Sequence, residues 1–254
     1  MSYSYAMPAC ALLLLLIPAC ALEQETAPID DASQAITKGS YDSGHHHVVQ
    51  VFPSGASLPC SGTLVGSRTV LTAKHCVVHD GQTTVTVVKP LCDLEGYCFD
   101  ESYSYAGIAK HYVGPGNYDV AIVNLVNSVV GVSPARITTA AAGAGQLVTL
   151  VGFGQTGANA GDYGIRRYGS NIVDQVNQTY LLLDDNGGNG TTSSSSCHGD
   201  SGGPAFKGGY WNTCVAGIAQ GGGASCTGLF WYTRADLVAT WVINNATEAI
   251  VTCP

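Results

Sequence analysis

The sequence predicts an all-β protein, a sandwich or barrel built from short strands. Runs of β-branched residues recur along the chain, and glycine, proline and asparagine separate them. The chain has 254 residues and contains 32 glycines, a composition suited to many tight turns. Only the C-terminal part shows the spacing of a helix, so we expect one helix there.

The predicted strands begin at residue 48 and follow one another between turns, a spacing typical of sandwiches and barrels. They cover 48–52, 62–65, 70–73, 83–88, 120–126, 146–151, 178–183, 214–219 and 229–233. The helix is predicted over 236–244. There Leu237 and Trp241, and likewise Val238 and Val242, lie four residues apart and form one apolar stripe.

The charge of the chain excludes one class of partner. Its formal net charge is −8, and lysine and arginine form no cluster. A protein that binds nucleic acid needs a basic surface, so we expect no nucleic-acid partner. The length is sufficient for a sizeable core.

The N-terminus reads as an export signal. The apolar run 12–17 is too short to span a bilayer, which needs about 20 residues. Residues 17–20 resemble a bacterial lipobox, in which Cys20 would carry a lipid anchor; the alternative is an ordinary signal peptide over 1–21. The acidic segment 22–35 then reads as a pro-segment. We expect a secreted or cell-surface protein.

Ten cysteines agree with export. Cys10 and Cys20 fall in the signal, and the eight that remain are an even number, which indicates disulfides. Zinc is the competing interpretation, but no pair among the eight forms a CxxC unit, so we expect no metal site. The consecutive histidines His45, His46 and His47 do not face one point on an extended segment, and a solvated surface is predicted for them.

Three motifs carry the chemistry. The string Cys-His-Gly-Asp-Ser-Gly-Gly-Pro spans 197–204 and places Ser201 in a glycine-rich loop. A serine hydroxyl is a weak nucleophile that needs a base, and His75 in Thr-Ala-Lys-His-Cys offers one. Asp119, just before an apolar run, offers a carboxylate that could orient the imidazole. Taken singly, each motif could be a structural turn.

The three motifs in the order His, Asp, Ser resemble the trypsin/chymotrypsin-like serine proteases over about 36–253. The resemblance implies two six-stranded Greek-key β-barrels with a C-terminal helix in a peptidase domain over 36–254. The N-terminal barrel would cover about 36–135 and the C-terminal barrel about 136–254. It also implies a monomeric serine endopeptidase that acts on protein or peptide substrates without a cofactor.

The resemblance assigns roles to these residues. Ser201 would be the nucleophile, His75 the base and Asp119 its orienting acid. The main-chain N–H groups of Gly199 and Ser201 would form the oxyanion hole. The family has Ser-Trp-Gly at the positions that hold Gln220-Gly221-Gly222 in this chain. This departure keeps a second interpretation open: a protease-like surface binding protein with little or no turnover. An esterase using the same triad ranks last.

The resemblance also implies two disulfides, Cys60–Cys76 and Cys197–Cys226. The other four cysteines would then pair as Cys92–Cys98 and Cys214–Cys253, for which the family offers no counterpart.

Activation of the family's zymogens implies a cut before Ile36, after which the new ammonium would pair with Asp200. The alternative is that Asp200 only hydrogen-bonds its own loop.

The substrate pocket is expected at Ser195, His198 and Gln220-Gly221-Gly222. Ser195 would be a neutral floor and His198 would lie at the rim. Gln220-Gly221-Gly222 replaces the Ser-Trp-Gly of the family along the wall of the pocket. Phe230 would narrow the pocket. We expect a preference for an uncharged residue before the cleaved bond.

Overall fold

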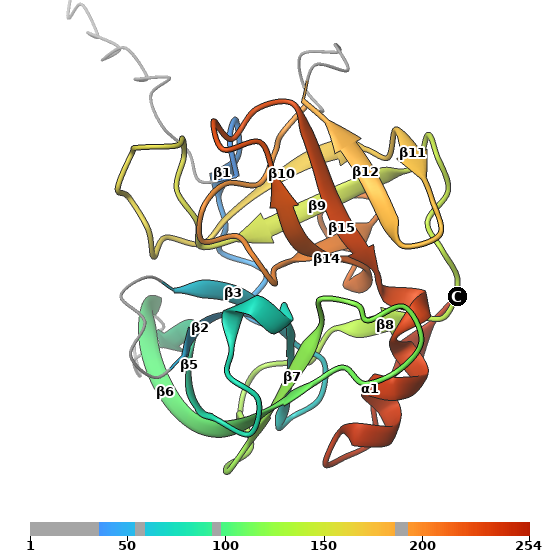
Figure 1. The fold of residues 1–254 in the computed structure, drawn as a ribbon. Helices are drawn as coiled ribbons and strands as arrows, with labels where there is room; N and C mark the ends of the chain where they lie inside the picture. Colours follow the sequence, from blue (N-terminus) through green and yellow to red (C-terminus); the bar gives the residue numbers. More distant parts are fainter. Residues whose placement is uncertain (1–35, 54–58, 93–97, 186–192) are drawn as a thin grey trace, which may run out of the picture. The chain divides into compact units, whose positions relative to one another are not determined.

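The computed structural model describes residues 36–53, 59–92, 98–185 and 193–254. The predicted signal peptide, its Cys20 lipobox and the pro-segment lie outside the described residues. The all-β prediction is confirmed: two curled sheets are followed by a single α-helix near the C-terminus (Figure 1).

Six strands close into a barrel in the first half of the described chain, in the order β2-β3-β4-β7-β6-β5. Their bounds are β2 Val48–Pro53, β3 Cys60–Leu64, β4 Thr69–Thr72, β5 Gln82–Cys92, β6 Cys98–His111 and β7 Ala121–Leu125. A short 3₁₀ turn, Lys74–Cys76, follows β4 at one end of the barrel.

The second half is a ten-stranded sheet, in which six main strands are extended by short ones. The main strands are β9 Leu147–Gly152, β10 Arg167–Ile172, β12 Tyr180–Asp184, β13 Pro204–Lys207, β14 Cys214–Gly222 and β15 Leu229–Arg234. The short strands are β1 Ser40–Tyr41, β8 Arg136–Thr138, β11 Gln175–Val176 and β16 Thr252–Cys253.

Alternate residues of single strands are buried in different cores. In β4, Val70 packs inside the first barrel, whereas Leu71 packs against residues of the second sheet and the helix. Ile122 and Val123 of β7 divide in the same way. Both faces of these strands are therefore buried, which explains why their sequences are continuous apolar runs and not alternating ones.

Strand β1 precedes the first barrel in sequence but packs on the second sheet, and helix α1 (Ala239–Asn245) follows the second sheet in sequence but packs on the first barrel. The N-terminal strand β1 pairs with β10 of the second sheet. At the other end, helix α1 buries Val242 in the core shared with the first barrel, and Asn124 of β7 donates a side-chain hydrogen bond to the carbonyl of Asn245. Trp241 of α1 packs against Tyr112, with ring centroids 5.4 Å apart.

The three consecutive histidines are not the solvated surface that their polarity suggested. His45 and His47 are 2% and 6% exposed. Nδ1 of His45 lies 2.9 Å from Oδ1 of Asp42, and its Nε2 lies 2.7 Å from the carbonyl oxygen of Tyr210. Both ring nitrogens therefore face oxygen atoms that can accept. Arg166 donates from Nε to Oδ2 of Asp42 (2.9 Å), so one buried carboxylate contacts both His45 and a buried guanidinium.

Strand β6 and the start of the helix differ from the sequence prediction. The sequence of β6 carries alternating tyrosine, serine and charged residues, and these lie on partly exposed positions, so no apolar run marks it. Over the predicted helix, Ala235–Leu237 forms a 3₁₀ turn and the α-helix begins only at Ala239. Over the described ranges, no helix combines the length and apolarity that crossing a bilayer requires.

Candidate active site

His75 is fixed by two hydrogen bonds to one carboxylate. It lies in the 3₁₀ turn after β4, and Asp119 lies just before β7, the strand that pairs with β4. The main-chain N–H of His75 donates to Oδ1 of Asp119 (2.9 Å), and ring Nδ1 lies 2.6 Å from Oδ2. An ionised carboxylate only accepts, so Nδ1 carries the proton and Nε2 is left to act as a base.

The carboxyl group of Asp119 is charged at neutral pH. Burial raises its pKa, but the hydrogen bonds and charge of His75 lower it more, with Lys74 contributing, and the net pKa lies below the usual value. The Asp119 side chain is 15% exposed and that of His75 is 45% exposed. The acid is therefore sheltered, while the imidazole reaches the surface.

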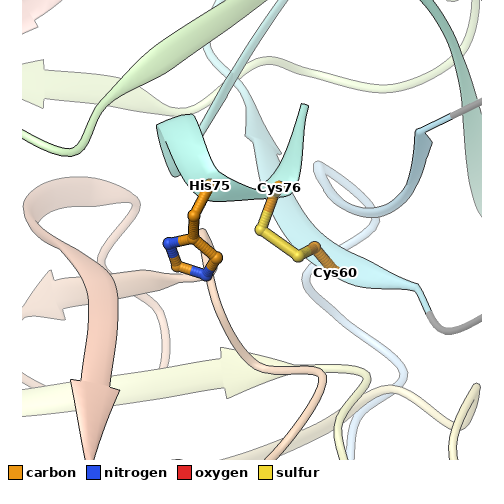
Figure 2. A group of neighbouring side chains, drawn as sticks. All are labelled: Cys60, His75 and Cys76. Atoms are coloured by element: carbon orange, nitrogen blue, oxygen red, sulfur yellow. A yellow bond between two sulfur atoms is a disulfide. The ribbon is translucent and has the colours of Figure 1, made fainter. Parts of the chain in front are cut away.

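A disulfide braces this histidine. Figure 2 shows the Cys60–Cys76 bridge beside the ring of His75, and it ties the start of β3 to the 3₁₀ turn. One potential ligand atom from each of these three residues lies within 4.8 Å of the other two, which resembles a metal cluster. The two sulfurs are bonded to each other, however, and offer no thiolate, so the group is not suited to a metal ion.

The same disulfide contacts the loop of the predicted nucleophile. The carbonyl oxygen of Ser201 accepts a hydrogen bond from the N–H of Ser61 (2.9 Å) and lies 3.6 Å from the sulfur of Cys76. The loop of Ser201 is thereby held next to the turn of His75. Both side chains lie in the described part of the chain, and no hydrogen bond joins Nε2 of His75 to Oγ of Ser201 there; such bonds are often long without substrate.

The loop around Ser201 leaves two main-chain donors free. The N–H groups of Asp200, Gly202 and Gly203 all donate to main-chain carbonyls. Those of Gly199 and Ser201 have no acceptor among the described residues. Gly199 has φ +98° and Gly202 φ +81°, values that favour glycine. At Gly202 a Cβ would also lie 2.1 Å from Oγ1 of Thr72.

Asp200 is buried beside Ile36, and each is 1% exposed. Its carboxylate accepts hydrogen bonds from the N–H groups of Cys197 (2.8 Å), Gly154 (2.8 Å) and Ile36. Burial raises the pKa of Asp200 to about 7, and the three hydrogen bonds oppose that rise. Without a paired cation, this carboxyl group is therefore close to half neutral at pH 7.

A cavity opens next to Ser201 and includes most of the expected pocket residues. It is lined by Ser196–His198, Ser201, Ala219–Gly223, Cys226 and Phe230. His198, Gln220, Gly221 and Gly222 are thus at the cavity. Ser195 is not: it is 1% exposed, and its hydroxyl contacts that of Thr37 and donates to the carbonyl of Cys226.

Ser196 takes the place at the cavity that the sequence assigned to Ser195, and its hydroxyl pairs with that of Tyr232. Spacing along the chain could not reveal this, because adjacent residues of an extended segment point to opposite sides. The Oε1 of Gln220 accepts a hydrogen bond from the hydroxyl of Thr233 (3.2 Å).

Three disulfides are present in the described chain: Cys60–Cys76, Cys197–Cys226 and Cys214–Cys253. Cys197–Cys226 connects the Ser201 loop to the segment before β15, so it closes one side of the cavity. The side chains of the remaining expected pair, Cys92 and Cys98, lie outside the described part of the chain.

Comparison with known proteins identifies the family. A family model described as Trypsin matches residues 36–242. The chain is 27% identical over 205 residues to "Serine protease SP24D" of Anopheles gambiae, covering 74% of this chain and 72% of that protein. It also resembles the solved structure titled "Structure of GrC", with a TM-score of 0.63 and 19% identity over 81% of this chain and 97% of that one. That likeness shows the fold, and because the family model covers well over half of the sequence, the chain belongs to the trypsin family.

Proposed function

We propose that the protein is an exported serine endopeptidase that hydrolyses peptide bonds with Ser201, His75 and Asp119. The observation that carries this proposal is the double hydrogen bond from His75 to Asp119 in a turn that adjoins the Ser201 loop. Membership of the trypsin family supports it. The three disulfides support an extracellular location.

In the proposed reaction, Oγ of Ser201 attacks the carbonyl carbon while Nε2 of His75 takes the hydroxyl proton. The N–H groups of Gly199 and Ser201, which lack protein acceptors, stabilise the oxyanion. The C–N bond then breaks, His75 gives its proton to the leaving amine, and an ester to Ser201 remains. Water attacks this ester through His75 and releases the acid.

The first prediction concerns covalent labelling. A fluorophosphonate probe is expected to label the processed protein, because His75 activates the hydroxyl of Ser201. The variant Ser201→Ala should lose labelling completely, whereas Ser225→Ala, at an exposed serine outside the cavity, should label like the native protein. In-gel fluorescence measures both. A folded, processed protein that does not label would favour the protease-like binding protein.

We further propose that the active form arises by cleavage between Ala35 and Ile36. Ile36 is already buried, and its N–H already donates to the carboxylate of Asp200. Cleavage would turn this N–H into an ammonium, and a cation at that position would lower the pKa of Asp200 and keep it ionised. The ion pair would fix the segment that carries Gly199 and Ser201.

The second prediction concerns the stability of the uncut chain against pH. The folded pKa of Asp200, about 7, lies above its ordinary value of 3.8, so the folded state binds more protons between these limits. The melting temperature of the uncut chain should therefore fall as the pH rises from about 4 to 7. The variant Asp200→Asn should not show this decrease in melting temperature with pH, and neither should the protein after cleavage before Ile36.

Thermal unfolding of cut and uncut protein at several pH values measures the effect, and mass spectrometry gives the N-terminus of the cut form. The activation proposal would be contradicted if melting temperature changed with pH equally in the cut and uncut protein. A fully active form that does not begin at Ile36 would contradict it as well.

A further inference from the structure

We infer that Phe230 makes the cavity beside Ser201 a shallow site for a small, uncharged side chain, so that cleavage follows residues such as alanine or valine. This inference rests on the proposed peptidase function and names its substrate class. It comes from the lining of the cavity, to which the aromatic ring of Phe230 contributes beside Gly222.

The ring of Phe230 lies across Gly222. The two residues are direct partners in the β14–β15 pairing. A Cβ added at Gly222 would lie 2.2 Å from Cδ1 of Phe230, closer than any real side chain allows. Phe230 therefore fills the volume next to the Gly222 main chain, and glycine is required there because the ring approaches so closely.

Phe230 cannot easily swing away. It is 2% exposed and packs in the core of the second sheet with Leu183, its partner on the opposite strand β12. Rotating the ring out would leave a void in a close-packed core, which is costly. The ring thus forms a fixed end to the cavity.

The serine hydroxyl at the cavity is already paired. The hydroxyl of Ser196 pairs with that of Tyr232 and needs no substrate partner. Ser195 is buried away from the cavity. Beside Phe230 the cavity therefore presents a ring and a satisfied hydroxyl, an environment suited to a methyl or isopropyl group.

No carboxylate is available for a basic substrate side chain. All residues that line the cavity belong to the described part of the chain, and none of them is an aspartate or a glutamate. Asp200 is nearby in sequence, but its oxygens accept the N–H groups of Cys197, Gly154 and Ile36. An arginine or lysine inserted here would lose water without gaining a partner, which is unfavourable.

The test compares peptide substrates that differ only in the residue before the cleaved bond: alanine, valine, phenylalanine or arginine. For the processed native enzyme, kcat/KM for alanine or valine should exceed that for phenylalanine and arginine by at least about 10-fold. In Phe230→Gly, kcat/KM for the phenylalanine substrate should rise by about 10-fold or more. Leu229→Ala, at the adjacent residue that is 45% exposed, is the matched control and should keep the native preference.

Fluorophosphonate labelling separates failure of this inference from failure of the proposed function. An enzyme that labels at Ser201 but prefers arginine or phenylalanine overturns the inference alone, and absence of labelling overturns the peptidase proposal. Phe230→Val removes less volume and replaces Phe230→Gly in the test if that variant does not fold. In Phe230→Val, kcat/KM for the phenylalanine substrate should also rise, by a smaller factor. A folded, labelled variant with unchanged preference also overturns the inference.

Discussion

Replacing Asp119 by asparagine is expected to lower kcat by about 10⁴-fold while the protein stays folded. The reason lies in the two bonds that Asp119 accepts. The main-chain N–H of His75 needs an acceptor at the position of Oδ1, so the amide oxygen of asparagine must take that position. The NH₂ group then faces Nδ1, which must accept, and the ring proton moves to Nε2.

With the proton on Nε2, the imidazole has no lone pair to offer to Ser201, so attack on the peptide carbonyl loses its base. The loss should appear in kcat with little change in melting temperature. Asp80→Asn is the matched control, because the side chain of this aspartate is 74% exposed and its carboxylate lies 3.5 Å from Nε2 of His79, away from the site. Steady-state hydrolysis of the preferred peptide measures the change. A variant with near-native kcat would show that His75 is not oriented by Asp119 during catalysis.

Replacing Asp42 by asparagine is expected to reduce the free energy of unfolding by about 3–5 kcal/mol. The carboxylate of Asp42 is fully buried, and it accepts hydrogen bonds from His45, Arg166 and Tyr210. An amide at this position is neutral and brings donors of its own, so the buried guanidinium of Arg166 loses its counter-charge. For a domain of this size the melting temperature should fall by roughly 10 °C.

The pH dependence distinguishes this effect from a simple packing defect. Burial raises the pKa of Asp42, but His45, Tyr210 and Arg166 lower it more, so the net pKa lies well below the ordinary value of 3.8. The stability that Asp42 contributes is therefore present above about pH 4 and is lost as the pH falls below that value. The difference in melting temperature between native protein and variant should shrink on acidification. A difference that does not depend on pH would indicate lost packing alone.

The sequence predicted which residues come together better than it predicted the shape of the cavity. His75, Asp119 and Ser201 stand in short motifs, and the structure joins His75 to Asp119 by hydrogen bonds and places the Ser201 loop beside the turn of His75. Their catalytic roles stay a prediction. Spacing alone left a sandwich open, and the resemblance to a family implied two six-stranded barrels. The trypsin-like fold is confirmed, with a closed six-stranded first barrel and a ten-stranded curled sheet in the second half. Strand β6 carried no apolar signal, because its side chains lie on partly exposed positions.

The pocket required coordinates. Ser195 and Ser196 are chemically identical neighbours, and only the direction of each side chain decides which one lines the cavity. The burial of His45 has a related cause. The polarity of this residue suggests water, but its ring nitrogens face Asp42, three residues earlier, and the carbonyl of Tyr210, 165 residues away. His47 is also buried, and its Nε2 has no hydrogen-bond partner among the described residues. Local patterns do not report such distant compensation.

The crossed ends of the chain have a consequence for any attempt to divide the protein. A gene fragment that encodes only the first half would include strand β1, whose pairing partner β10 it lacks, and would lack α1, which covers its barrel. A fragment for the second half would have the reverse defects. Ile36, the first described residue, is thus packed in the core of the half that carries Ser201, while His75 belongs to the other half. If cleavage occurs before Ile36 as proposed, the new N-terminus would therefore act directly on the half that carries Ser201.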